Sequence, residues 1–238
     1  MENQTHILRA FDRDLEGIQA SIMKMGGLVE AAISDAAKAL ETRDAELAQK
    51  VRAGDKPIDA LEHAVNEDAA RILALRQPIA GDLRTVLTVF RLSGALERMG
   101  DYAKNIAKRT GVLMEMDEIE GTTKSLRRMA RLVELMLKDA LDAYIQRDVD
   151  LARDVRDRDL EVDQMYSGLF REYLTFMMED PRNITPCMHL HFIAKNIERM
   201  GDHVTSICEQ VIYLVDGAYP DDDREKGDAT ATGAPDAG

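Results

Sequence analysis

The chain consists of two copies of one unit, and this duplication constrains its fold more than any other feature. The phrase Glu-Arg-Met-Gly-Asp stands at residues 97–101 and again at residues 198–202. The segments before it also align, residues 25–59 with residues 129–163. A repeat of domain length predicts that each unit folds in the same way and carries its acidic phrase at the same point.

Apolar residues recur at helical spacing along the chain, and no stretch alternates with the period of two that a half-buried strand needs. We therefore predict an all-α protein. Short connections at Arg43-Asp44 and Arg147-Asp148 make neighbouring helices antiparallel, which gives two tandem three-helix bundles. The six long helices are expected at residues 5–42, 45–76, 81–111, 122–147, 149–178 and 183–215.

The duplication also sets the expected organisation of the chain. The first three-helix unit should span residues 1–115 and the second residues 116–217. Residues 218–238 are rich in Asp, Gly, Ala and Thr, and are predicted to form a disordered acidic tail. Two irregularities are expected inside helices, a kink near Gly54-Asp55 caused by Pro57 and a bend at Gly26-Gly27.

Composition narrows the possible partners. The formal net charge is −13 and the sequence pI is about 4.9, which argues against nucleic acid or an anionic membrane as the main partner. No apolar run approaches the length of a membrane span, so we expect a cytoplasmic protein without direct membrane insertion. Cys187 and Cys208 would lie on one helix, too far apart to form a disulfide bridge.

Carboxylates are the residues most suggestive of function. Two acidic residues four positions apart lie on the same face of a helix, and four such pairs occupy repeat-equivalent places. Antiparallel packing should bring the two pairs of each unit together, forming an all-oxygen site suited to Mg²⁺, Mn²⁺, Ca²⁺ or iron. The eight candidate metal ligands are Asp55, Asp59, Glu97 and Asp101 in the first unit, and Asp159, Asp163, Glu198 and Asp202 in the second.

Two other interpretations of these acids stay open. They can be ordinary helix charges, solvated or paired with basic neighbours; the candidates are Arg98, Lys104, Arg158 and Arg199. In that case the chain is a structural scaffold. Alternatively, bound metal could serve a carboxylate-metal enzyme, such as a hydrolase or an oxidase. Because the acids lie one position past the apolar seam residues, we expect them to face solvent or a partner.

No other motif indicates catalysis. The Glu-x-x-His pairs of di-iron proteins do not occur, and there is neither a glycine-rich phosphate loop nor a nucleophile elbow. His203 stands where the first unit has Tyr102. As the neighbour of Asp202 it points to another side of the helix, so it is a weak candidate ligand. The sequence therefore indicates no catalytic residue.

Taken together, these features resemble the PhoU family, the accessory regulators of the phosphate-specific transport system. The resemblance rests on the twofold Glu-Arg-Met-Gly-Asp, the twofold Asp-x-x-x-Asp on the preceding helix, Arg-Gln-Pro-Ile-Ala-Gly-Asp-Leu-Arg at residues 76–84, and a His6…Phe11 start. It covers residues 1–217. It implies two similar three-helix bundles, usually assembled as a homodimer.

The resemblance also implies a role and a ligand. Family members are expected to damp phosphate uptake and the phosphate-starvation response by bridging the ATPase subunit of the phosphate ABC transporter and a sensor histidine kinase. The family's Glu/Asp-x-x-x-Asp motifs bind divalent or trivalent metal ions, which places the metals on the eight acids named above. No reaction is implied. This sequence departs from the pattern in having Pro57 within the first pair, and in lacking the Arg-Gln-Pro phrase in its second unit.

Overall fold

The computed structural model describes residues 2–76, 78, 80–119 and 121–220, and for residues 2–12 and 76 the backbone alone. Within these residues it is helical and contains no strand, which confirms the all-α prediction. The side chains of His6 and Phe11, and the tail from residue 221, lie outside the described part. The helices are α1 (Glu2–Thr42), α2 (Ala45–Arg76), α3 (Gly81–Leu113), α4 (Thr122–Gln146), α5 (Val149–Glu179), the 3-10 turn η1 (Pro181–Asn183) and α6 (Ile184–Asp216).

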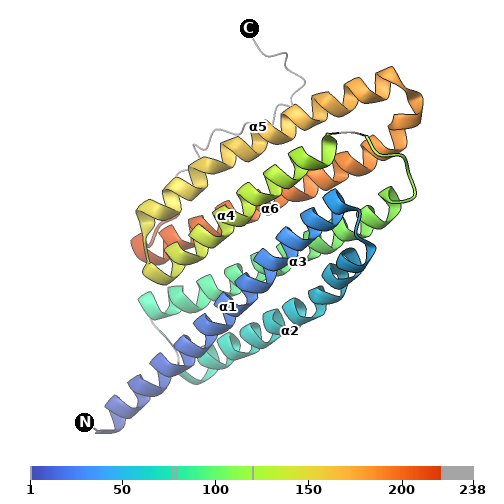
Figure 1. Ribbon diagram of the computed structural model, residues 1–238. Coiled ribbons are helices and arrows are strands. Elements are labelled where there is room, and N and C mark those ends of the chain that lie inside the picture. The colour runs from blue at the N-terminus through green and yellow to red at the C-terminus, as the bar shows by residue number, and fades with distance from the viewer. Residues whose placement is uncertain (1, 77, 79, 120, 221–238) are drawn as a thin grey trace.

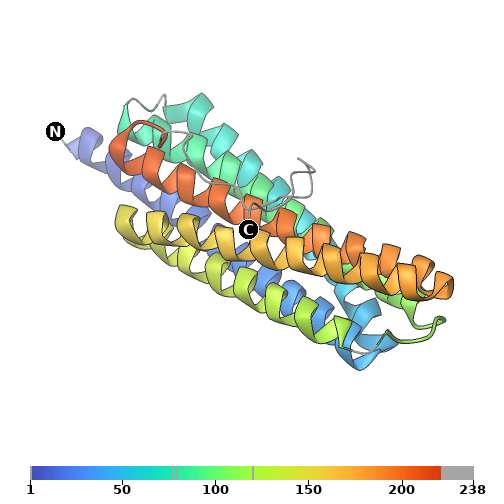
Figure 2. The same cartoon turned by 90° about the horizontal axis from the view of Figure 1, so that it is seen from above.

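The six long helices form two three-helix units that pack side by side (Figure 1). Helices α1, α2 and α3 contact one another, as do α4, α5 and α6, and the units meet along α3–α6 and α1–α4. One layer therefore has the order α2–α3–α6–α5, with α1 and α4 behind it (Figure 2). Buried aliphatic residues from all six helices form one continuous core, so the two units share their interior.

The repeated Arg-Asp dipeptides are the turns between the first two helices of each unit. Arg43 and Arg147 have left-handed backbone conformations, with φ of 52° and 54°. Asp44 and Asp148 then cap the next helix, accepting hydrogen bonds from the backbone N–H groups of Leu47 at 2.9 Å and Leu151 at 3.0 Å. Each aspartate satisfies a helix N–H that has no intrahelical acceptor. This turn chemistry explains why the dipeptide is duplicated.

The connection between the units is held by one side chain. Nη2 of Arg43 donates hydrogen bonds to the carbonyl oxygens of Leu113, Met114 and Met116, at 3.0, 2.9 and 2.9 Å. These carbonyls belong to the end of α3 and the segment after it, where helical partners run out. Arg43 therefore ties the turn after α1 to the connection that leads into α4.

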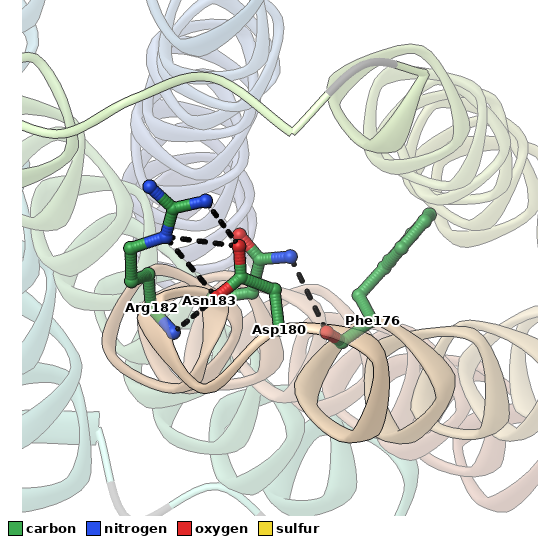
Figure 3. Close-up of polar contacts among 4 residues, drawn as sticks. All are labelled: Phe176, Asp180, Arg182 and Asn183. Atoms are coloured by element: carbon green, nitrogen blue, oxygen red, sulfur yellow. Dashed lines mark hydrogen bonds and ion pairs between the residues drawn. The ribbon is translucent and has the colours of Figure 1, made fainter.

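The connection between α5 and α6 is closed by local polar contacts (Figure 3). The Asp180 carboxylate accepts hydrogen bonds from the backbone N–H of Arg182 at 2.9 Å and from its guanidinium at 2.7 Å. Those bonds lower the pKa of Asp180. Nδ2 of Asn183 donates to the carbonyl oxygen of Phe176 at 3.3 Å. The chain thus reverses direction within a few residues.

The two expected irregularities do not interrupt the helices. Helix α2 continues through Pro57, which is exposed, as are Ala53 and Gly54. The carbonyl that loses its hydrogen bond four residues before the proline can therefore be hydrated. Helix α1 continues through Gly26, where an added Cβ would overlap Leu141 of α4. Gly26 allows close packing between the two units.

Candidate metal sites

The first acidic cluster lies between α2 and α3, and a glycine brings these helices together. A Cβ on Gly100 would lie 3.0 Å from Cδ1 of Ile58 and 3.8 Å from Oδ1 of Asp55. The α3 backbone therefore packs directly on the α2 face that carries Asp55. As a result Asp55 is only 3% exposed, and its Oδ1 is buried without a hydrogen-bond partner.

Two basic side chains enter this cluster. Nζ of Lys104 hydrogen-bonds to Oδ2 of Asp55 across the helix boundary and lies 3.6 Å from Oδ1 of Asp101. Arg98 is 3.6 Å from Glu97 and 3.8 Å from Asp101. The hydrogen bond to Asp55 raises the pKa of Lys104. The Lys104 ammonium therefore attracts carboxylates of both helices, Asp55 of α2 and Asp101 of α3.

The remaining acids of the cluster repel one another. Burial, and then the charge of Asp55, raises the pKa of Asp59. Burial, and then Asp101, raises the pKa of Glu97, with smaller contributions from Asp59 and Glu62. Acids of the α2 pair and acids of the α3 pair therefore raise one another's pKa. Glu62 joins them as an additional acid one helical turn beyond Asp59.

The second cluster lies between α5 and α6 and packs even more tightly. A Cβ on Gly201 would come within 2.5 Å of Oδ1 of Asp159 and 3.4 Å of Cγ1 of Val162. Asp159, Asp163 and Glu198 are all buried, Asp159 to 2% exposure. The glycine of the repeated phrase thus has the same packing role in both units.

A different lysine accompanies the second cluster. Nζ of Lys195 hydrogen-bonds to Oε1 of Glu198 at 2.8 Å and lies 4.9 Å from the ring centroid of Tyr166. The other oxygen of Glu198, Oε2, is buried without a hydrogen-bond partner. Burial raises the pKa of Glu198, and the bond to Lys195 opposes that shift. This cluster therefore also contains a buried oxygen that is available to a ligand.

The two clusters adjoin the seam between the units. Tyr102 and His203, which follow the two repeated phrases, face each other across α3 and α6 with ring centroids 5.7 Å apart. Burial lowers the pKa of His203, favouring the neutral ring. His203 thus packs against its repeat equivalent, Tyr102, where the two units meet. The acidic phrases belong to α3 and α6, which are neighbouring helices of one layer (Figure 2).

The expectation that the acids face solvent was wrong for half of them. Four of the eight are buried, namely Asp55, Asp159, Asp163 and Glu198. The phrase glycines account for the burial of Asp55 and Asp159, because the glycine backbone packs directly on these two carboxylates. Arg98 and Lys104 form ion pairs with acids of the first cluster, as the alternative interpretation of these acids predicted. Arg158 forms its ion pairs with Asp139 and Asp154. Glu62 and Lys195 were not predicted from the sequence. Glu62 could have been found from its position three residues after Asp59, on the same helix face.

The side chains fit a hard cation in their chemistry, because carboxylate oxygens are the ligands that Mg²⁺, Mn²⁺, Ca²⁺ and iron accept. Each cluster also holds a buried oxygen without a hydrogen bond. As the side chains stand, no three acidic, histidine or cysteine groups in the described part of the chain converge on one point. Binding would therefore require the half-exposed acids to turn toward the buried ones.

Fold and clusters define a class, the duplicated all-helical proteins with one interhelical acidic cluster in each repeat. The PhoU domain matches residues 22–110 and 126–211, and the chain belongs to the PhoU family. Within the described residues, none of the helices combines the length and apolarity needed to cross a bilayer.

Similar proteins extend over almost the whole chain. A Rhizobium meliloti protein named phosphate-specific transport system accessory protein PhoU homolog is 44% identical over 97% of both chains. A Zymomonas mobilis protein of the same name is 48% identical over 89% of both chains. The crystal structure of PhoU from Pseudomonas aeruginosa superposes with a TM-score of 0.85 at 40% identity, covering 87% of this chain and 100% of that one. The crystal structure of the phosphate transport system regulatory protein PhoU from Streptococcus pneumoniae superposes with a TM-score of 0.81 at 31% identity. It covers 89% of this chain and 99% of that one.

Proposed function

We propose that this protein is a negative regulator of phosphate uptake and of the phosphate-starvation response, and that it acts by binding instead of catalysis. The observation that carries the proposal is the near-complete alignment with proteins named as accessories of phosphate transport. A fold shared with a regulatory protein of the same transport system supports it. The role then follows from contacts with other proteins.

The proposal includes two metal sites of one kind, one in each unit. The first would use Asp55, Asp59, Glu97 and Asp101, and the second Asp159, Asp163, Glu198 and Asp202. The buried oxygens of Asp55 and Glu198 that lack hydrogen bonds support this assignment. Divalent or trivalent ions such as Mg²⁺, Mn²⁺, Ca²⁺ or iron suit the oxygen ligands. Bound ions would neutralise like charges and link the two helices of each cluster.

The proposed partners are the ATPase subunit of the phosphate transporter, a sensor histidine kinase and a second copy of the chain. A cytoplasmic protein is implied, in contact with the membrane only through these partners. Nucleic acid is a poor partner for a chain of net charge −13. The α2–α3–α6–α5 layer carries both acidic clusters, which suits a surface that responds to metal occupancy and to partner binding.

No observation favours the rival, a carboxylate-metal enzyme. Such an enzyme needs an acid, base or nucleophile beside an open metal position. Burial raises the pKa of Cys208 to about 12, so this thiol stays protonated at neutral pH. Burial lowers the pKa of His203, whose ring packs on Tyr102. These groups serve packing.

Deletion and complementation test the proposed role. A strain lacking the gene should take up phosphate without restraint and express starvation genes in phosphate-rich medium, and the wild-type gene should restore control. The variant Glu97→Gln/Asp101→Asn/Glu198→Gln/Asp202→Asn should restore it poorly. Its matched control is Asp150→Asn/Asp154→Asn, a pair with the same spacing outside both clusters. Unchanged phosphate regulation in the deletion strain would contradict the proposal.

A further inference from the structure

Lys104 occupies the centre of the first acidic cluster. Its Nζ is bonded to Oδ2 of Asp55 on α2 and lies 3.6 Å from Oδ1 of Asp101 on α3. These two oxygens belong to both acidic pairs of the proposed first site. A metal ion held by both pairs would draw on the same two carboxylates, and two cations that close together repel each other strongly. The ammonium therefore stands where the ion would bind.

The second cluster has no lysine at the equivalent position. The repeat places Thr205 there, and its hydroxyl donates a hydrogen bond to the backbone carbonyl of Asp202 at 2.8 Å. The lysine of this cluster, Lys195, comes from a different position and bonds to Glu198. The two clusters thus carry similar acids, but only the first unit has a lysine three residues after the repeated phrase, and this lysine bonds to Asp55.

We propose that Lys104 is a tethered competitor for the metal ion of the first site, so that the first site binds metal more weakly than it would without this side chain. The inference rests on the proposed metal binding and adds that a side chain of the same unit lowers the metal affinity of the first site. An incoming ion must displace the ammonium from Asp55 and Asp101.

The structure offers a route for that exchange. The Lys104 side chain is 42% exposed, so its flexible stem can carry the ammonium into water. Asp55 stays in place because it is buried, and its Oδ1 already lacks a hydrogen-bond partner. Metal at the first site therefore releases a lysine onto the surface of the α2–α3–α6–α5 layer. Threonine in the second unit provides no such release.

Mn²⁺ titration followed by electron paramagnetic resonance of the free ion tests the inference. The background is the full chain with Glu198→Gln/Asp202→Asn, which removes the second site. Adding Lys104→Thr should tighten Mn²⁺ binding by at least about tenfold, because it removes a unit charge a few ångströms from the ion. Lys104→Arg keeps the charge and should leave the affinity low. Lys108→Thr, four residues along α3, controls for the change in net charge.

The outcomes separate this inference from the proposed function. Equal Mn²⁺ affinity with and without Lys104→Thr, or no binding by either chain, would overturn the inference. If Lys104→Thr fails to fold, as judged by its thermal transition, Lys104→Met keeps most of the apolar stem and serves in its place. A gain in Mn²⁺ affinity on Lys104→Thr, found together with unchanged phosphate regulation in the deletion strain, would support the inference and contradict only the proposed function.

Discussion

Gly201 packs directly on the carboxylate of Asp159, so closely that a Cβ at this position would lie 2.5 Å from Oδ1. The two residues come from different helices, α6 and α5. The contact shows why the repeated phrase contains glycine immediately before its aspartate. Glycine allows the helix carrying the second acidic pair to approach the helix carrying the first, and the acids of both helices are then enclosed together.

Gly201→Ala should destabilise the fold. Helix propensity alone favours alanine over glycine by about 1 kcal/mol. The overlap with Asp159 should reverse that sign and lower the unfolding free energy by about 1–3 kcal/mol, as overpacking does elsewhere. Urea denaturation measures the difference.

Gly168→Ala is the matched control, because this helical glycine on α5 has no atom within 4 Å of an added Cβ. It should raise the unfolding free energy by about 0.5–1 kcal/mol. If Gly201→Ala were stabilising by a similar amount, the packing account of the phrase glycine would be incorrect.

Asp44 and Asp148 should contribute equally to stability because they cap α2 and α5 through the same turn. Replacing either with alanine should lower the unfolding free energy by about 1 kcal/mol. Asp157→Ala, an exposed position inside α5, should change it by less than about 0.5 kcal/mol. Thermal denaturation of the three variants makes the comparison. Loss of stability in only one of the caps would argue against equivalent turns.

Arg43→Ala should loosen the connection between the units. The substitution removes three hydrogen bonds to carbonyl oxygens after α3 and should cost about 2 kcal/mol. Hydrogen exchange should accelerate at the amides of residues 114–119. Arg147→Ala has nearly the same backbone φ and is the exposed repeat equivalent. It should leave exchange in that segment unchanged, and equal effects of the two variants would contradict the role given to Arg43.

Stability should decrease as pH rises through the titration of Glu198. Burial raises its pKa in the folded protein above the ordinary value of 4.5. The folded state then binds more protons than the unfolded state between 4.5 and the raised pKa, so the unfolding free energy falls across that window as pH increases. Glu198→Gln should flatten this part of the profile, measured by urea unfolding at a series of pH values. A variant profile parallel to that of the wild type would show that Glu198 does not contribute.

Much of the fold could be predicted from the repeat and from helical periodicity. Arg43-Asp44 and Arg147-Asp148 mark the turns because a left-handed residue followed by a capping aspartate is local chemistry, readable within a few positions. Helix boundaries followed from the same kind of signal. The behaviour of Pro57 could not be predicted in this way, because the cost of proline depends on whether the freed carbonyl meets water or protein.

The candidate site was predicted less completely than the fold. Four-residue spacing placed the acids of each pair on one helix face, but it did not reveal that Asp55 and Asp159 are buried. That burial depends on glycines more than 40 residues away in sequence. Lys104 was visible as a basic neighbour, whereas its contact with Asp55 is a tertiary one. The contact of Lys195 with Glu198 came into view only with the helices in place.

The sequence by itself determined the two repeated units, the six helices and the identity of the acids, because these depend on local spacing and on short-range backbone chemistry. Tertiary structure alone decided how the units share one core, which acids are buried and which cation accompanies each cluster. Interhelical packing sets those properties, since the distance between two helices depends on the side chains of both. A glycine permits the approach, and the partner helix determines what it encloses.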